Sequence, residues 1–259
     1  MGEQLKIWTV ANQKGGVGKT TTVVSLSALL AQRGKKVLML DTDPHASLTY
    51  YFGFDSEELS FGVYDIFTKS DTMTKRQWQQ CVWQSPVPNL DILPASLAMS
   101  TLDGLLGKQP GMGLIIKKAL HKFAQEYDYV LIDCPPILGV LMVNALAACE
   151  RVLIPVQTEC MALKGLERMY RTMELIQVSQ EKTYNVCIIP TMYDKRTRAS
   201  ITAYRELREK YGDKVWEGVI PIDTNFRNAS MEKLPLPVYS KSSRGSFAYS
   251  ELLKLLDSE

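Results

Sequence analysis

Short apolar runs, rich in β-branched residues and bounded by turn-forming residues, recur along this chain and predict β-strands. Seven such runs are present, at residues 5–11, 35–43, 90–95, 129–133, 151–156, 185–190 and 215–221. Apolar residues also recur at helical spacing, as at residues 20–33, which end before Gly34, and at residues 113–127. Strands that alternate with helices predict an α/β fold: a doubly wound, mostly parallel sheet flanked by helices on both faces.

Residues 46–89 break this regular alternation. They mix aromatic side chains with polar turns and interleaved acidic residues, which disfavours a surface for stacking nucleic-acid bases. We expect helices that pack on the core here, and a surface for a partner or for a second copy of the chain. No linker long enough to divide the chain is apparent, so residues 1–259 are predicted to form a single domain.

The composition is that of an ordinary globular protein, with 46% hydrophobic and 22% charged residues among 259. The 30 basic and 28 acidic residues leave a net charge of +2, far below the excess that by itself indicates nucleic-acid binding. Five scattered cysteines without C-x-x-C spacing are expected to be reduced core thiols, and two histidines are too few for a histidine-based metal site. No secretory leader or membrane-spanning run is recognisable, so a cytoplasmic location is expected.

A glycine-rich turn follows the first predicted strand and opens the first predicted helix, in the stretch from Gln13 to Thr21. Glycines let successive backbone N–H groups point inward at phosphate oxygens, and a helix start adds unpaired N–H groups and the positive end of its dipole. In the P-loop pattern G-x-x-x-x-G-K-[ST], Lys19 would bridge the β- and γ-phosphates and Thr20 would place its hydroxyl on Mg²⁺. The alternative, a solvated glycine-rich turn, fits the strand and helix context poorly.

The match to that pattern is incomplete, because Gln13 stands where the pattern has glycine. The string KGGVGKT, from Lys14 to Thr20, instead resembles the deviant Walker A box of the ParA/MinD family of P-loop ATPases. In that family a second lysine reaches phosphates across a dimer interface, and the resemblance assigns this role to Lys14. It also implies ATP and Mg²⁺ as cofactors and an ATP-bound homodimer. The implied nucleotide-binding residues of the box are Lys14, Gly15, Gly16, Val17, Gly18, Lys19, Thr20 and Thr21.

The second predicted strand ends in two carboxylates, Asp41 and Asp43, at the edge where the strands of doubly wound sheets present ligands. A carboxylate beside a phosphate site can orient an attacking water, and Asp43 is the candidate for this catalytic role. For Asp41, a role in capping or turn formation is an equal alternative. The segment resembles the D-x-D-P-Q switch motif of the family, with His45 in place of the usual glutamine, which leaves the role of His45 open.

The fourth predicted strand ends in Asp133, and the proline pair Pro135 and Pro136 follows shortly after it. An apolar strand that ends in an acid is the expected form of a Walker B element, so Asp133 is predicted to hold Mg²⁺ through water. The prolines fix the backbone where a γ-phosphate sensor would lie, and they resemble the D-x-P-P switch of the family. Three elements in this order, each at the end of a predicted strand, support one another.

In this family the loops after the later strands contact the base, which carries over Thr191 and Pro221 as adenine neighbours. ParA-type members often bind DNA non-specifically as ATP-bound dimers, through phosphate contacts that are sensitive to salt. The candidates for such contacts are Lys195, Arg196, Arg198, Arg205, Arg227, Lys233, Lys241 and Arg244. For any single one of them a solvated surface charge is the simpler interpretation, although Lys195, Arg196 and Arg198 form a dense cluster.

Two other branches of the family are disfavoured. A membrane-positioning member needs a basic amphipathic helix at its C-terminus, whereas the segment from Tyr249 onward has leucines at helical spacing and a net negative charge. We expect this segment to pack on the core, and no membrane to be bound. An electron-transfer member needs a cluster cysteine several residues after the Walker B acid, and none lies between Cys134 and Cys149.

The cargo is a separate question, because one fold hosts many functions. Local strings such as DTDPHASLT (residues 41–49) and VQTE (residues 156–159) resemble the ParC-type members, which place chemotaxis arrays at cell poles. That resemblance implies a slow, partner-stimulated ATPase with an array coupling protein or a polar landmark as partner, concentrated at the pole. The alternatives are a plasmid or chromosome partition ATPase that binds non-specific DNA, and an ATP-dependent biosynthetic ligase.

Overall fold

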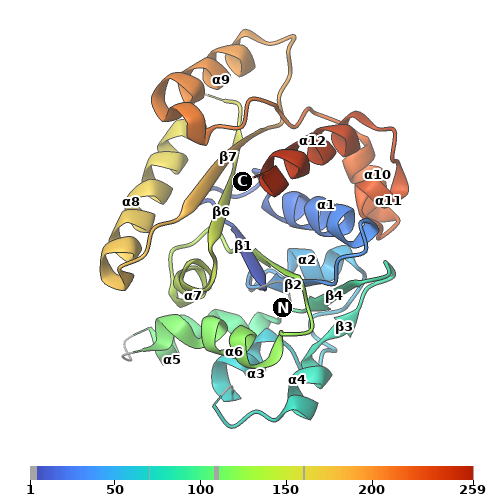
Figure 1. Cartoon of the computed structure of the whole chain (residues 1–259), viewed down its shortest axis with the longest axis vertical. Coiled ribbons are helices and arrows are strands. Elements are labelled where there is room, and N and C mark those ends of the chain that lie inside the picture. The colour runs from blue at the N-terminus through green and yellow to red at the C-terminus, as the bar shows by residue number, and fades with distance from the viewer. Residues whose placement is uncertain (1–4, 70, 108–110, 160, 259) are drawn as a thin grey trace.

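The structure is a computed structural model that describes residues 5–69, 71–107, 111–159 and 161–258. Its centre is a seven-stranded sheet with the order β3-β4-β2-β5-β1-β6-β7 (Figure 1). Neighbouring strands are parallel except β3 and β4, which pair antiparallel at one edge. The strands are β1 (Lys6–Val10), β2 (Val37–Asp41), β3 (Trp83–Gln84), β4 (Leu90–Leu93), β5 (Tyr129–Asp133), β6 (Arg151–Gln157) and β7 (Asn185–Thr191).

Helices cover both faces of the sheet, as the sequence predicts (Figure 1). The first and last helices, α1 and α12, bury their apolar residues against one face, and α3, α6, α7 and α8 cover the other. The α-helices of the described ranges are α1 (Lys19–Gln32), α2 (Ser47–Tyr51), α3 (Val63–Lys69), α4 (Lys75–Cys81), α5 (Leu102–Leu106), α6 (Ile115–Phe123), α7 (Val140–Ala148), α8 (Ala162–Gln180), α9 (Arg198–Tyr211), α10 (Asn225–Met231), α11 (Leu236–Tyr239) and α12 (Arg244–Ser258).

The strands are apolar on both faces because both faces are covered. Successive side chains of a strand point to opposite sides of a sheet. In β1, Ile7 is buried on the side of α6, α7 and α8, whereas Trp8 is buried on the side of α1 and α12. This double burial explains why the strands appear in the sequence as continuous apolar runs without polar alternation.

Six of the seven predicted strands are confirmed, and the seventh is wrong. Residues 215–221 make only two isolated bridges, one at Val215 and one at Pro221. Between them the side chain of Trp216 lies over Gly218, where an added Cβ atom would be 2.3 Å from the indole ring. Gly218 has no side chain to pack in a sheet, and it lies in the middle of the segment, between the two bridges.

The helices predicted between residues 46 and 89 are present as α2, α3 and α4, but the strand β3 at the end of this segment was not predicted. Two residues, Trp83 and Gln84, are too few to produce a periodic pattern. The buried Trp78 of α4 stacks on Phe123 of α6, with 5.3 Å between the ring centroids. The aromatic side chains of this segment therefore serve the core in part, as expected for packed helices.

The C-terminal helix α12 packs on the core, as the sequence predicts, and its neighbour there is α1. Its residues Leu252, Leu253 and Leu256 are buried in the core that α1 shares. Cysteines 81, 134, 149 and 187 are also buried, as predicted for core thiols, whereas Cys160 lies outside the described residues. None of the helices in the described ranges combines the length and the apolar composition that crossing a bilayer requires.

Candidate nucleotide site

The sequence elements predicted to carry chemistry meet at one edge of the sheet. β2, β5, β1, β6 and β7 lie side by side in that order, and they are parallel. Parallel strands present their carboxyl ends at the same edge, where ligands bind in doubly wound folds. The glycine-rich loop follows β1, Asp41 ends β2, Asp133 ends β5 and Thr191 ends β7.

The loop between β1 and α1 has the form of an anion cradle. Gly16 and Gly18 have φ angles of +71° and +92°, in the left-handed region that other residues rarely adopt. Cβ atoms added to Gly15 or Gly16 would meet nothing within 4 Å, so the backbone borders open space. Helix α1 begins at Lys19 without a side-chain cap, which leaves its first N–H groups available to an anion.

The two lysines of the loop point in different directions. Lys19 is buried, and its ammonium donates a hydrogen bond to the carbonyl of Lys14 at 3.1 Å, so it closes the cradle from within. The Lys14 ammonium instead contacts the Glu159 carboxylate and lies 3.5 Å from Oε1 of Gln157. Gln157 ends β6 and Glu159 follows it, so Lys14 reaches beyond its own cradle. The ion pair with Glu159 was not predicted from the sequence.

Gln13, the residue that departs from the P-loop pattern, has a structural role. Its Nε2 donates a hydrogen bond to the hydroxyl of Thr172 at 2.6 Å. Thr172 belongs to α8 and is buried. A glycine at this position would leave the loop without that tie, so the substitution connects the phosphate loop to the helix that follows β6.

The proposed metal residues Thr20 and Asp133 are in direct contact. The Thr20 hydroxyl donates to Oδ2 of Asp133 at 2.6 Å, and a hydroxyl that donates its hydrogen keeps its lone pairs for a cation. Oδ1 of Asp133 is buried and has no hydrogen-bond partner among the described residues. Both features fit a divalent cation or its bound water. Among the described residues, no group of three or more His, Cys, Asp or Glu side chains is arranged to hold a metal ion.

Burial raises the pKa of Asp133 far above that of an ordinary aspartate, and the nearby Asp41 carboxylate raises it further. The hydrogen bond from Thr20 and the Lys19 ammonium act in the opposite direction. A buried carboxyl group of this kind gains most from a cation, because the cation stabilises the charged form. The donor set and its electrostatics therefore suit Mg²⁺.

Asp41 and Asp43 have different surroundings. Oδ1 of Asp41 accepts from the backbone N–H of Asp43 at 3.1 Å, and Oδ2 accepts from the N–H and the hydroxyl of Thr49. Both oxygens are thus engaged in holding the turn and α2, which favours the turn-forming alternative for Asp41. Asp43 is buried at the edge of the site, and its Oδ1 accepts from the N–H of His45 at 3.0 Å. The His45 side chain is exposed.

A cavity of about 420 Å³ adjoins the cradle on the side of β7, and it is called the base cavity because the residues predicted to neighbour adenine lie in it. Thr191 and Pro221, the predicted adenine neighbours, both line it. The Thr191 hydroxyl donates to the carbonyl of Val17 at 2.9 Å, so its hydrogen is already used within the protein. Sequence reasoning missed the aromatic wall of this cavity, Phe226 and Tyr249, whose rings meet edge to face.

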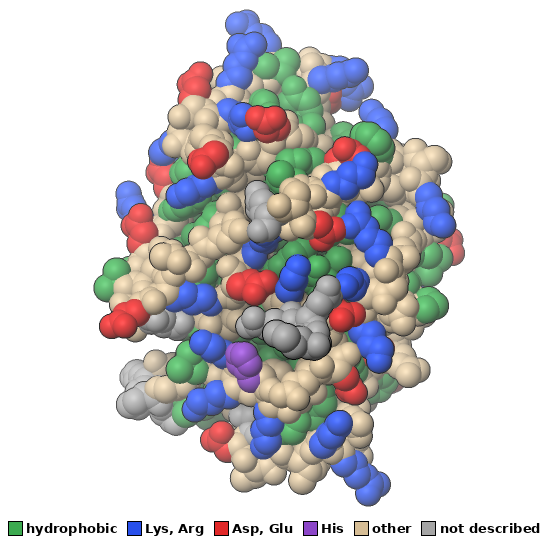
Figure 2. All heavy atoms as spheres, viewed as in Figure 1, with side chains coloured by type: hydrophobic (Ala, Val, Ile, Leu, Met, Phe, Trp, Pro, Cys, Tyr) green, Lys and Arg blue, Asp and Glu red, His purple; other side chains and the backbone are tan. Residues whose placement is uncertain are grey.

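The basic residues named as DNA candidates are exposed, and about half of them gather near this cavity. Arg227 lines the base cavity itself. Lys195, Arg196 and Arg244 border a neighbouring hollow of about 540 Å³, although Arg196 also pairs with Asp194 at 2.7 Å. Basic side chains are spread over the face seen in Figure 2, with several at the upper end near α9. Arg198, Arg205 and Lys233 line none of the hollows described here.

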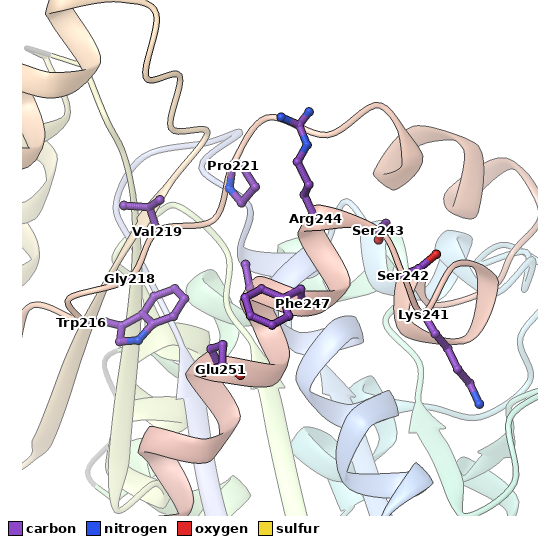
Figure 3. A pocket seen from close by; sticks show the side chains of 11 residues that line it. Trp216, Gly218, Val219, Pro221, Lys241, Ser242, Ser243, Arg244, Phe247 and Glu251 are labelled. Atoms are coloured by element: carbon purple, nitrogen blue, oxygen red, sulfur yellow. The ribbon is translucent and has the colours of Figure 1, made fainter.

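A further hollow of about 550 Å³ lies between the 216–221 segment and α12 (Figure 3). The rings of Trp216 and Phe247 lie beside each other in it, while Lys241 points away from them. Pro221 borders both this hollow and the base cavity, so the two hollows adjoin each other at this residue.

Comparison with known proteins gives consistent results. A model of the AAA domain family AAA_31 matches residues 5–186. The sporulation initiation inhibitor protein Soj of Bacillus subtilis (strain 168) is 37% identical over 250 residues, which cover 96% of this chain and 97% of Soj. The chromosome partitioning protein ParA of Caulobacter vibrioides (strain NA1000 / CB15N) is 34% identical over 253 residues, which cover 96% of this chain and 93% of ParA.

A solved structure agrees with these relatives. The crystal structure of cobyrinic acid a,c-diamide synthase from Mycobacterium smegmatis, with bound ADP and magnesium, superposes with a TM-score of 0.83. It is 30% identical, and the match covers 98% of this chain and 94% of the synthase. The match over most of the chain, the identities and the cradle geometry lead to one conclusion: the chain belongs to the ParA/MinD family of P-loop ATPases, whose cofactors are ATP and Mg²⁺.

Proposed function

We propose that the chain acts as a single P-loop domain, over residues 1–259, and is an ATP-dependent dimerising switch that hydrolyses ATP slowly until a partner stimulates it. The observation that carries this proposal is that the two lysines of the loop make different contacts. Lys19 fills the cradle of its own chain, whereas the partly exposed Lys14 reaches out of it toward Glu159. An ammonium on the rim can serve the phosphates of a second copy without leaving its own site uncompensated.

In this proposal two subunits enclose two ATP molecules. Lys19 and Thr20 would bind the phosphates and the metal within one subunit, Asp133 would hold the metal through water, and Lys14 would bind the phosphates of the other subunit. Bound Mg²⁺ supplies positive charge that neutralises the β- and γ-phosphate oxygens. Asp43 orients the attacking water, and loss of the γ-phosphate then frees the segments that begin at Asp43 and at Asp133, so that the dimer loosens.

The switch, we infer, moves or segregates an intracellular cargo, with non-specific DNA as the surface it binds. The basic residues near the base cavity favour DNA. Arg227, Lys195 and Arg244 border adjoining hollows, so a bound nucleotide can influence the side chains that contact the phosphates of DNA. The names of the relatives, which include a chromosome partitioning protein, support the same choice. The overall charge of +2 means that such binding depends on local clustering.

A polar chemotaxis array is the second candidate cargo. It is favoured by the strings DTDPHASLT and VQTE, which resemble the ParC-type members. Both strings lie at the nucleotide site, at the ends of β2 and β6, so they describe the switch more directly than the cargo surface. In that case an array coupling protein or a polar landmark would take the place of DNA.

The Asp43→Ala variant tests the proposal, because loss of the water-orienting carboxylate should trap the ATP-bound state. We expect light scattering to show a monomer with ADP and a dimer with Mg·ATP. Adding non-specific DNA at low salt then separates the two cargoes: a dimer that binds DNA supports partition, and a dimer that ignores it supports the array. A monomer under all conditions, together with steady turnover when a small carboxylate acceptor is supplied, would support a biosynthetic ligase and refute the switch.

A further inference from the structure

Helix α7 begins shortly after the proline pair, and a residue from another element caps it. The residue at its N-cap, Gly139, has no side chain that could satisfy the first N–H groups. Instead, Oδ1 of Asp103 in α5 accepts the backbone N–H of Val140 at 2.6 Å. Asp103 is 37 residues away in the sequence, so this contact joins two separate parts of the fold.

Gly139 is matched to this carboxylate in shape. An added Cβ atom at Gly139 would lie 2.4 Å from Oδ2 and 2.5 Å from Oδ1 of Asp103. The backbone of Gly139, with φ of −157°, is extended and would accept other residues. Glycine is therefore needed at this position for space rather than for conformation, and the space is that of the Asp103 carboxylate.

The loop that runs from Asp133 to Gly139 is thus held at both ends. At the strand end, the carbonyl of Asp133 accepts from the N–H and the hydroxyl of Thr42, and the N–H of Cys134 donates to the carbonyl of Val10. At the helix end the anchor is Asp103. Between the anchors Ile137 and Leu138 are exposed, so packing does little to fix the middle of the loop.

The remainder of α7 is also clamped by the chain around α5 and α6. Nδ2 of Asn144 donates to the carbonyl of Met112 at 2.6 Å, and its Oδ1 accepts the N–H of Ile116 at 3.2 Å. Asn144 is fully buried and fixes the second turn of α7. Asp103 is the contact that extends this clamp to the first turn, next to the loop.

We infer that Asp103 is a positioning residue for the ATPase cycle: its carboxylate fixes the helix end of the 134–139 loop, so that Pro135 and Pro136 are held in place against the γ-phosphate side of the site. The inference rests on the proposed switch. Asp103 touches neither nucleotide nor metal in this account, so it should affect the response to ATP and not the binding of ADP to the cradle.

A double-mutant cycle with Asp103→Ala and Gly139→Ala tests the inference. Each single variant should lower the rate of ATP hydrolysis and the ATP-dependent dimer population about fivefold to tenfold, the scale of a lost helix cap. Each should leave ADP affinity within about twofold of the unmodified protein. Asp103→Asn keeps an oxygen acceptor for Val140 and should restore activity, because Asn and Asp cap helices about equally.

The cycle also separates positioning from general stability. The three atoms nearest to an added Cβ at Gly139 all belong to the Asp103 carboxylate, so adding Gly139→Ala to Asp103→Ala should cause no further loss. Additive losses, or an Asp103→Ala protein that hydrolyses ATP and dimerises normally, would overturn the inference. Loss of ADP affinity in proportion to activity would show a structural role only. Failure of the unmodified protein to dimerise with ATP would refute the switch instead. The role of Asp103 would then be judged from the ATP hydrolysis rates and ADP affinities of the variants alone.

Discussion

The hydroxyl of Thr20 donates a hydrogen bond to Oδ2 of Asp133 at 2.6 Å, so the helix after the phosphate loop is tied directly to the end of β5. The other oxygen of Asp133 is buried without a partner among the described residues. A carboxyl group with one satisfied and one unsatisfied oxygen is a place where burial works against the charged form. The metal-free protein therefore carries an electrostatic cost at its centre that Mg·nucleotide can remove.

The first prediction concerns pH. Burial raises the pKa of Asp133 in the folded protein above its unfolded value, so the group favours folding at low pH, and this contribution is lost as the pH rises through the folded pKa. The melting temperature of the nucleotide-free protein should fall between about pH 5 and about pH 8, above the range in which an unfolded aspartate ionises. Asp133→Asn should flatten this dependence, and saturating Mg·ADP should reverse it.

Thermal unfolding measured by circular dichroism across that pH range is the test. Burial also raises the pKa of Asp41, so a residual slope in Asp133→Asn is expected from that group. A nucleotide-free protein whose melting temperature rises steadily toward pH 8 would contradict the assignment of a raised pKa to Asp133.

The second prediction concerns Lys19. Its buried ammonium already donates to a loop carbonyl, and with nucleotide it would meet phosphate oxygens at close range. Lys19→Ala should weaken ADP binding about 100-fold, the scale of one or two charge-assisted hydrogen bonds. Titration with a fluorescent ADP analogue measures this, and Lys75→Ala, at an exposed lysine of α4, is the matched control. If the two variants bound ADP with equal affinity, Lys19 would not be a nucleotide-binding residue.

The third prediction concerns Lys14, which should separate nucleotide binding from dimerisation. Its ammonium lies outside the cradle of its own chain, so Lys14→Ala should retain ADP affinity within about twofold. The ATP-dependent dimer should be lost, even in an Asp43→Ala background in which hydrolysis cannot consume the nucleotide. Sedimentation with Mg·ATP measures the dimer. A Lys14→Ala protein that still dimerises would refute the proposal that Lys14 binds the phosphates of the other subunit.

The fourth prediction follows from the partner of Lys14. The Lys14 and Glu159 side chains are 29% and 41% exposed, so their ion pair is screened and its contribution is small. Glu159→Gln should release the ammonium and shift ATP-dependent dimerisation to about twofold to fivefold lower protein concentration. Glu217→Gln, which removes the exposed partner of Arg208, is the control. Weaker dimerisation of Glu159→Gln would instead show that Glu159 belongs to the dimer contact.

Much of this architecture was predictable because its determinants are local in sequence. A buried parallel strand is apolar on both faces, so β1, β2, β4, β5, β6 and β7 each appear as a short apolar run. The cradle is equally local, since glycines, a lysine and a threonine must occur together between a strand and a helix. Strand order places Asp43 and Asp133 beside that cradle, so their proximity follows once the sheet is parallel.

The features that were missed depend on contacts between distant residues. Residues 215–221 have the composition of a strand, yet they form only two isolated bridges, and the Trp216 ring lies over Gly218 between them. The ion pair of Lys14 with Glu159 joins residues that are 145 positions apart in the sequence, and the periodicity of apolar residues cannot predict such a contact. The cap of α7 by Asp103 is of the same kind, because a single acid among apolar residues gives no pattern that identifies its partner.

The last prediction tests the connection between the C-terminal helix and the phosphate loop. The Thr22 hydroxyl donates its hydrogen to the carbonyl of Gly18 at 2.8 Å, so the buried Tyr249 hydroxyl, 2.9 Å away, must be the donor to Thr22. Tyr249→Phe removes this donor while keeping the ring. It should lower the free energy of unfolding by about 1 kcal/mol, which corresponds to a melting temperature lower by about 2–4 °C. Tyr239→Phe, at an exposed tyrosine, should change neither quantity, and equal stabilities of the two variants would show that the Tyr249 hydroxyl does not help to hold α12.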